Sequence, residues 1–532
     1  MSKPVAVTTI PELVDQAANR YGERIFLEDG NTKLSFNDFA QQCRQVADAL
    51  ISKGINKGDR IALWAPNTVE WVIAAIGAQC AGAILVTLNT RYKGPEAAYI
   101  LNKSRAKLLF SIGYFLDTDY PAQLSNESLP DLQQIVVFPD SSPDNQVSSA
   151  PHLSWEALLD GNGAANTRQV SDRMADVGGS DVSDILFTSG TTGDPKGVMT
   201  CHKQNLRAFT TFSDILGLET GDRYLVINPF FHSFGYKAGI LACLLKGVTL
   251  LPHAVFDPTS VLQRIAADKI TVMPGPPTLF QSLLAHPDLQ QFDISTLKCA
   301  TTGAAVIPVE LIHKMKSVLG FETVITAYGL TESCGLVTMC RHGDSAETIA
   351  TTSGRVIPDV ELRCVDSENQ SVATGEPGEI VVRGYNVMKG YFENDAATQE
   401  SIDSDGWLHT GDIGVLDEAG NLKITDRLKD MFITGGFNCY PAEIEKLIAA
   451  HDEITMCAVI GIPDERMGEV AMAFVVSKPD AQLDEKALIG WCRDKMANYK
   501  VPRKIAFVDS LPLNASGKVV KPELKKLAAE KY

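Results

Sequence analysis

Positive charge is scarce in this chain of 532 residues. Lysine and arginine together number 48 against 65 aspartate and glutamate residues, which gives a formal net charge of −17. A nucleic-acid surface or a polybasic membrane patch would have to act against this overall field, so neither is expected. Small-molecule partners are favoured, and an anionic ligand would have to be held by local cations and backbone amides.

Long apolar runs, C-x-x-C pairs and the residue pattern of a signal peptide are also lacking, so we expect neither a membrane span nor export. The longest apolar stretch, residues 71–88, is broken by glycine and glutamine and falls short of the ~20 residues that a transmembrane helix needs. The eleven cysteines form no C-x-x-C pair, and the first residues contain no basic and then apolar region. We therefore expect a cytoplasmic protein. Cys334, Cys340 and His342 raise the question of a metal site, but a fourth ligand with suitable spacing is missing, so core or surface thiols are favoured.

The hydrophobic pattern alternates between helices and apolar strands, which is typical of layered α/β architecture. The expected elements of the first part are strand 59–64, helix 69–80 and strands 83–88, 108–110 and 135–138. The polar stretches 139–154 and 161–184 are expected to be surface connections. Glycine-containing turns separate short strands over 375–424, which predicts a β-rich subdomain, and the last ~100 residues have the pattern and size of a separate α+β domain.

The most informative segment is 184–198, where an apolar strand ends in hydroxyl residues and glycines around one lysine. Glycines let backbone amides close around an anion, hydroxyls donate to phosphate oxygens and lysine supplies charge. The residues expected to contact a polyphosphate are Thr188, Ser189, Gly190, Thr191, Thr192, Gly193 and Lys196. An ordinary flexible surface loop is the alternative. A P-loop is excluded, because counting from Gly190 puts Pro195 at the second glycine and Gly197 at the magnesium-binding hydroxyl.

This segment resembles the signature loop of the adenylate-forming superfamily, which includes acyl-CoA synthetases, nonribosomal peptide adenylation domains and firefly-type luciferases. The resemblance extends to further motifs of the family, which occur in family order at residues 328–332, 407–412, 426–438 and 512–518. The resemblance covers essentially the whole chain. It implies an ATP-dependent acyl-CoA ligase: a carboxylate attacks the α-phosphorus of ATP, pyrophosphate leaves, and coenzyme A then takes the acyl group from the adenylate.

The resemblance also implies roles for the residues closest to the reaction. Lys518 would bridge carboxylate and phosphate, unless it is a solvated lysine in a turn. Thr331 would donate to the α-phosphate. Glu332 would be the Mg²⁺ ligand, with a helix N-terminal carboxylate as the alternative. His232 would gate the passage between acyl pocket and thiol tunnel, unless it is simply buried among phenylalanines.

Other residues would hold the nucleotide. Tyr328, in the pair Tyr328-Gly329, would lie against the adenine, and Asp412 would accept both ribose hydroxyls. Arg427 would hold the ribose or a phosphate edge, or else form a surface ion pair. Small residues expected to form a further pocket wall are Gly303, Ala304 and Ala305.

The family comparison predicts a large N-terminal domain of layered α/β/α subdomains, residues 1–428, with the β-rich subdomain at about 354–426. A small mobile α+β domain, residues 429–532, would rotate about a hinge at Lys429. Rotation would remove Lys518 and present Gly435 and Gly436 to the pantetheine tunnel, where a side chain would narrow the passage.

Residues 182–187, 227–245 and 424–438 resemble bacterial ligases that activate the propanoate side chain of the two-ring indanedione left by steroid degradation. A fatty acid is the other expected substrate. Lys237 could donate to a ring ketone at the far end of the acyl pocket, or it could extend its ammonium from a helix end into water.

Other functions stay open at the level of sequence. An adenylation enzyme that loads a carrier protein is the main alternative, and a silent nucleotide-binding scaffold is another. The luciferase activity would require oxygen chemistry for which no residue is evident. A homodimer is among the expected assemblies, and a lysine acetyltransferase that silences Lys518 is among the expected partners.

Overall fold

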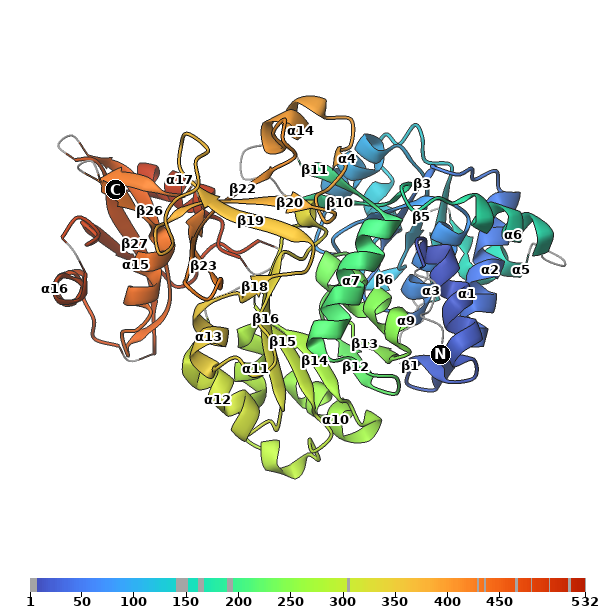
Figure 1. Ribbon diagram of the computed structural model, residues 1–532, viewed down its shortest axis with the longest axis horizontal. Coiled ribbons are helices and arrows are strands. Elements are labelled where there is room, and N and C mark those ends of the chain that lie inside the picture. Colours follow the sequence, from blue (N-terminus) through green and yellow to red (C-terminus); the bar gives the residue numbers. More distant parts are fainter. Residues whose placement is uncertain are drawn as a thin grey trace. The chain divides into compact units, whose positions relative to one another are not determined.

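A computed structural model describes residues 7–139, 152–160, 167–188, 195–303, 307–427, 430–434, 437–464, 467–479, 481–496, 498–514 and 518–531 (Figure 1). The chain forms two compact units. The first contains residues 1–361 and 383–408, and the second contains residues 362–382 and 409–532.

The first unit contains a largely parallel sheet with the strand order β21-β11-β10-β4-β3-β5-β8-β9. Its strands are β3 (Arg60–Trp64), β4 (Ile84–Thr87), β5 (Ala106–Ser111), β8 (Gln134–Val137), β9 (Leu153–Ser154), β10 (Val182–Thr188), β11 (Lys196–Cys201) and β21 (Gly390–Tyr391). Strands β3, β4, β5 and β8 are mutually parallel, as apolar strands joined by crossover segments must be. Strand β10 is parallel to β4, whereas β11 turns back beside β10.

A second sheet of this unit has the order β18-β17-β16-β15-β14-β12-β13-β1-β2. Its strands are β1 (Ile25–Asp29), β2 (Thr32–Ser35), β12 (Arg223–Val226), β13 (Thr249–Pro252), β14 (Val272–Gly275), β15 (Cys299–Thr302), β16 (Thr323–Tyr328), β17 (Thr338–Met339) and β18 (Arg355–Val356). In Figure 1 the helices α10, α11 and α12 lie against strands β14, β15 and β16 of this sheet. Parallel strands are covered on their faces by helices, as their apolar composition requires.

Helices and short elements connect these strands. The helices are α1 (Ile10–Tyr21), α2 (Phe36–Ser52), α3 (Val69–Cys80), α4 (Gly94–Ser104), α5 (Trp155–Asp160), α6 (Thr167–Asp176), α7 (His202–Leu216), α8 (Ser233–Gly235), α9 (Ala242–Lys246), α10 (Pro258–Asp268), α11 (Pro277–Leu284), α12 (Val309–Ser317), α13 (Ala346–Thr351) and α14 (Asp395–Ser401). The short elements are the hairpin β6 (Tyr114–Phe115) and β7 (Thr118–Asp119), the 3-10 helices η1 (Pro121–Leu124), η3 (Leu289–Gln291) and η4 (Thr331–Ser333), and the π-helix η2 (Tyr236–Leu241).

Helix α3 has the bounds expected from sequence, and all of its residues except Glu70 are buried. The hydroxyl of Thr68 accepts a hydrogen bond from the Trp71 amide and caps the helix. The expectation of a surface connection over 161–184 was wrong for residues 167–176, which form helix α6. Its polar composition conceals a narrow apolar stripe, in which Val170 and Met174 are buried.

The second unit begins with strands that form a sheet in the order β19-β20-β22-β23. They are β19 (Val360–Val365), β20 (Gly378–Gly384), β22 (Leu408–Leu416) and β23 (Leu422–Arg427). Strands β22 and β23 are antiparallel neighbours, with Asp412 opposite Arg427.

The C-terminal part of this unit is an α+β sandwich. Its elements are β24 (Phe432–Thr434), β25 (Phe437–Cys439), α15 (Pro441–Ile448), β26 (Ile454–Asp464), β27 (Gly468–Ser477), α16 (Glu485–Lys495), β28 (Lys504–Phe507) and α17 (Lys521–Lys531). Alternate residues of β26 point to opposite faces, so Val459 packs with Ile444 of α15 on one side and Ile460 packs with Leu524 of α17 on the other.

The predicted fold class is confirmed: the protein is α/β, with a large N-terminal part and a smaller C-terminal domain. The predicted domain boundary at residues 428 and 429 lies outside the described residues and stays a prediction, as does the hinge at Lys429. Among the described helices, none combines the length and apolar character that crossing a bilayer requires.

Candidate active site

Strands β10 and β11 form the hairpin that carries the predicted phosphate loop. Thr188 is the register partner of Lys196, so the two described ends of the loop lie side by side. Residues Ser189, Gly190, Thr191, Thr192 and Gly193 of the prediction lie outside the described residues. Gly197 is required by packing, since a β-carbon there would lie 2.7 Å from Cγ2 of Ile185 on the neighbouring strand.

The predicted adenylate-contact motif follows strand β16 as a tight turn. A β-carbon on Gly329 would lie 2.3 Å from the carbonyl carbon of Gly335, so only glycine fits at this point of the turn. Gly335 itself has a φ of 90°, which glycine adopts without strain. The close approach of these two backbones places Thr331 and Glu332 in the short helix η4. Glu332 thus lies in the first turn of a short helix, and this helix packs against the hairpin strand β11. Its role as the Mg²⁺ ligand stays a prediction.

Tyr391 connects the hairpin to this turn. Its hydroxyl donates a hydrogen bond of 2.9 Å to Oε1 of Glu332, and its ring centroid lies 5.1 Å from the Nζ atom of Lys196. Burial and the neighbouring Glu332 carboxylate raise the pKa of Tyr391, so the phenol stays a hydrogen-bond donor at neutral pH. One side chain therefore contacts both the predicted cation and the predicted metal ligand.

The donor set fits Mg²⁺ bound together with a nucleotide. Glu332 offers hard carboxylate oxygens, and its Oε2 has no hydrogen-bond partner among the described residues. The described part of the chain contains no group of at least three His, Cys, Asp or Glu side chains arranged to hold a metal on its own. Mg²⁺ does not need such a cage, because it keeps water and takes most other ligands from substrate phosphates.

Tyr328 and Gly303 lie at the ends of neighbouring parallel strands, β16 and β15. Tyr328 is buried and pairs in register with Thr338 of β17. Ala304 and Ala305 lie outside the described residues. The adenine pocket expected from Tyr328 and these small residues stays a prediction, although the parallel register places the described pair at the same edge of the sheet.

His232 is exposed, so the alternative of a simply buried histidine was wrong. Its Nδ1 accepts a hydrogen bond of 3.2 Å from the Phe234 amide, and it caps the short helix α8. The predicted gating role stays a prediction.

Lys237 does not extend its ammonium into water, so the alternative of a solvated lysine at a helix end was wrong. It lies in the π-helix η2 with 0% of its side chain exposed. Its Nζ is 3.0 Å from Oδ1 of Asp184, which is also fully buried, and donates to Oγ1 of Thr200 at 2.9 Å. Asp184 also accepts from Ser183 and Asn205. Because Asp184 belongs to β10, this buried ion pair joins the segment after His232 to the strand that precedes the phosphate loop.

The remaining predicted site residues belong to the second unit. Asp412 is 5% exposed in β22, and its amide donates to Oγ1 of Thr410 at 3.1 Å. Arg427 is its register partner, while the side chain of Arg427 lies outside the description. Gly435, Gly436 and Lys429 are also outside it.

Lys518 is exposed, and its backbone is bonded to Asn514. Its amide donates to Oδ1 of Asn514 at 2.9 Å, and its carbonyl accepts from the Asn514 amide at 2.7 Å. The backbone of this lysine is thus held by two hydrogen bonds to Asn514. This arrangement suits a lysine that delivers charge to a ligand, and that role stays a prediction.

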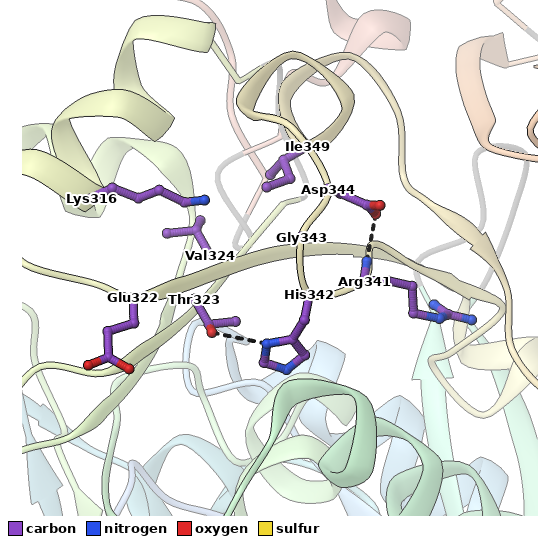
Figure 2. A pocket seen from close by; sticks show the side chains of 9 residues that line it. All are labelled: Lys316, Glu322, Thr323, Val324, Arg341, His342, Gly343, Asp344 and Ile349. Carbon is purple, nitrogen blue, oxygen red and sulfur yellow. Dashed lines mark hydrogen bonds between the residues drawn. The ribbon is translucent and has the colours of Figure 1, made fainter.

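The cysteines near His342 do not form a metal site with it. His342 lines a small pocket, shown in Figure 2, where its Nδ1 lies 3.2 Å from Oγ1 of Thr323. Cys340 contacts Oγ1 of Thr326 and Cys334 is buried, as expected for core thiols. None of the predicted site residues lines this pocket.

Sequence reasoning missed two parts of this arrangement. Tyr391 looks like an ordinary strand residue, and nothing in the spacing relates it to Glu332, which lies 59 positions away. The partner of Lys237 was also missed, although an aspartate within an otherwise apolar strand was a usable signal, because a buried carboxylate requires a nearby cation or donors.

The fold and this site define a nucleotide-dependent enzyme of the AMP-binding class. A family model described as AMP-binding enzyme matches residues 14–392, and one described as AMP-binding enzyme C-terminal domain matches residues 443–518. The chain belongs to this family of adenylate-forming enzymes.

Individual relatives narrow the comparison. The chain is 48% identical over 519 residues to the 3-[(3aS,4S,7aS)-7a-methyl-1,5-dioxo-octahydro-1H-inden-4-yl]propanoyl:CoA ligase of Mycobacterium tuberculosis, covering 98% of this chain and 99% of that protein. The anthranilate CoA ligase AuaEII in complex with anthranoyl-AMP has a TM-score of 0.84 at 27% identity, with 99% of both chains covered. O-succinylbenzoate coenzyme A synthetase (MenE) from Bacillus subtilis, in complex with ATP and magnesium ion, has a TM-score of 0.81 at 27% identity, covering 96% of this chain and 99% of that one.

Proposed function

We propose that this protein converts a bicyclic, steroid-derived propanoate to its coenzyme A thioester. The class of reaction is that of the family: it is an ATP-dependent acyl-CoA ligase that forms an acyl-adenylate. The observation that carries the substrate proposal is the 48% identity along nearly the full length of both chains to a ligase for a dioxo-indane propanoate. The relative and both solved structures are named as coenzyme A ligases or synthetases, so nothing favours loading of a carrier protein.

The first half-reaction joins a carboxylate oxygen to the α-phosphorus of ATP as the bond to pyrophosphate breaks. Negative charge builds up on the phosphoryl oxygens, so positioning and electrostatics supply most of the catalysis. Lys196 would hold phosphate oxygens, Thr331 would donate to the α-phosphate and Lys518 would bridge carboxylate and phosphate. Glu332 would hold Mg²⁺, which would supply positive charge against the phosphate oxygens.

In the second half-reaction the thiol of coenzyme A attacks the acyl carbon and AMP leaves. His232 would gate the approach of the thiol, and Gly435 and Gly436 would border its tunnel. Asp412 would hold the ribose in both steps, because a carboxylate accepts two hydroxyl groups at once.

A panel of acids tests the substrate. Pyrophosphate exchange and thioester formation would be measured with the dioxo-indane propanoate, with its deoxy analogues, with medium-chain fatty acids and with aryl acids. We expect the highest kcat/KM for the bicyclic acid. A fatty or aryl acid turned over with a higher kcat/KM would overturn the substrate proposal, while no exchange with any acid would overturn the ligase itself.

Lys518→Ala tests the division of labour between the two half-reactions. It should abolish pyrophosphate exchange but leave thioester formation from a supplied acyl-adenylate within about threefold of the wild type. The reason is that the second step transfers an acyl group, so there is no transferring phosphoryl group for Lys518 to stabilise. Lys526→Ala, an exposed lysine on α17, is the matched control and should leave both reactions unchanged. Equal losses in both half-reactions would contradict the role assigned to Lys518.

Location, assembly and modification are also part of the proposal. All eleven cysteines are free thiols, which suits the reducing cytoplasm. The exposed side chain of Lys518 suits an acetyltransferase, and acetylation would remove the charge that adenylation uses. Normal exchange by a fully acetylated sample would refute this, and light scattering of the purified protein tests the expected homodimer.

A further inference from the structure

We propose that Tyr391 is a positioning residue that holds Glu332 and Lys196 apart and oriented at the nucleotide site. The proposal deepens the ligase function above, on which it rests, and concerns a residue outside the family motifs identified in the sequence. Its basis is a single side chain that contacts an anion through its hydroxyl and a cation through its ring.

The backbone around Tyr391 is tied to both parts of the site. Strand β21 pairs with β11, where Tyr391 is the register partner of Val198, two positions beyond Lys196. The Phe392 amide donates to the Gly197 carbonyl at 2.7 Å, and the Met388 amide donates to the Glu332 carbonyl at 2.8 Å. The phenol is thus carried by a segment that is bonded to the hairpin on one side and to the turn of Glu332 on the other.

The ring itself has little freedom. Tyr391 is 8% exposed. Its amide donates a hydrogen bond of 2.9 Å to Oγ1 of Thr398, which belongs to helix α14. Met388, Ala397 and Leu408 form the apolar cluster around it. A ring packed in this way places its hydroxyl and its face in fixed directions, which a mobile side chain could not do.

The physical need for such a residue follows from charge. An ammonium and a carboxylate close together in a partly dry site attract each other strongly, and an ion pair between them would occupy the groups that a phosphate and a magnesium ion need. A ring face attracts the ammonium without taking its hydrogen-bond donors in the way a carboxylate does. The hydroxyl occupies one oxygen of Glu332, while Oε2 has no partner among the described residues.

The chain offers a matched control in Tyr21. Like Tyr391, Tyr21 is 8% exposed, and a cation lies over its ring: Cζ of Arg20 is 5.3 Å from the ring centroid. Its hydroxyl also donates one hydrogen bond, which is 3.1 Å long and goes to the Leu245 carbonyl. Tyr21→Phe therefore removes a hydroxyl from the same kind of packed ring. It differs from Tyr391→Phe in contacting no residue of the site.

The experiment measures ATP binding by calorimetry in magnesium and in EDTA, and separately the magnesium concentration that half-saturates pyrophosphate exchange. Tyr391→Phe should weaken binding of ATP in magnesium by roughly tenfold and raise the half-saturating magnesium by a similar factor, because Glu332 loses a charge-assisted hydrogen bond. Binding of ATP in EDTA should change by less than about twofold, since the ring still faces Lys196. Tyr391→Leu, which also removes the ring, should weaken ATP binding in both conditions.

A double substitution shows whether Tyr391 acts through Glu332. Glu332→Gln should remove most of the magnesium dependence, and adding Tyr391→Phe to it should have no further effect. A role in stability alone would instead lower the melting temperature of Tyr391→Phe and Tyr21→Phe alike and leave the magnesium dependence of both unchanged, which would overturn the proposal. The binding measurement needs no acid substrate, so it judges Tyr391 even if exchange by the wild type fails, a result that would count against the ligase function instead.

Discussion

Replacing Lys237 with methionine removes a charge from a place that water does not reach. The side chains of Lys237 and Asp184 are both 0% exposed, and their charged atoms are 3.0 Å apart. Methionine matches the length of the lysine stem, so packing is largely kept while the ammonium is lost. The carboxylate of Asp184 then stays buried without its cation.

The expected cost is large. Removing one partner of a buried ion pair typically costs about 3–5 kcal/mol, against a total stability of about 5–15 kcal/mol for a folded protein. Asp184 keeps three donors, from Ser183, Thr200 and Asn205. These donors still stabilise the buried carboxylate, so we expect a loss in the free energy of unfolding at the lower end of this range, about 3 kcal/mol.

The assay is urea unfolding followed by tryptophan fluorescence. Trp71 is a local probe, because its ring centroid lies 6.1 Å from that of Tyr236, the neighbour of Lys237 in the π-helix. Asp184→Asn alone should also destabilise, whereas Asp184→Asn combined with Lys237→Met should cost less than the sum of the two. Additivity within about 0.5 kcal/mol would refute the ion pair as a coupled unit.

The same variant decides whether Lys237 contacts the substrate. Its Nζ is held by Asp184 and Thr200. We therefore expect Lys237→Met to change kcat/KM for keto and deoxy acids by the same factor. A loss confined to the keto substrate would show instead that the ammonium reaches a ring ketone.

Three further outcomes follow from the geometry. Gly329→Ala should lower the rate of pyrophosphate exchange by roughly a hundredfold, because the added β-carbon would lie 2.3 Å from backbone and would displace the turn. The control Gly490→Ala, which has open space around it, should leave the rate unchanged. Equal rates for the two variants would refute the packing argument. Burial lowers the pKa of His202 from 6.5 to about 4, so the unfolded chain binds the proton more readily than the folded protein does. The contribution of His202 to the free energy of unfolding should therefore be fully present above pH 6.5 and should fall by up to roughly 3 kcal/mol towards pH 4. His202→Asn, which keeps an acceptor for the Ile10 amide, should flatten this part of the urea midpoint profile, and an unchanged slope would contradict it. Burial raises the pKa of every cysteine, so a disulfide reagent at about pH 8 should label the native protein slowly and all eleven thiols after denaturation; fast native labelling of even one thiol would argue against this packing.

The family and the order of its motifs were readable from sequence because each motif is local. A glycine-rich loop between two strands, or a glycine that only a tight turn requires, is specified by neighbouring residues. The bounds of helix α3 were predicted for the same reason, since its apolar run and its Thr68 cap are adjacent in the chain. Helix α6 was missed because its few buried residues are diluted by polar ones.

Contacts between distant residues were decided by the tertiary structure alone. Tyr391 meets Glu332 and Lys196 only because β21 adds to the edge of β11, and no pattern along the chain records that pairing. Lys237 could be noticed in the sequence as an unusual cation, but its burial and its partner Asp184 come from the packing of the π-helix against strand β10. A chain specifies its local turns through neighbouring residues, whereas the pairing of buried charges depends on which surfaces the whole fold brings together.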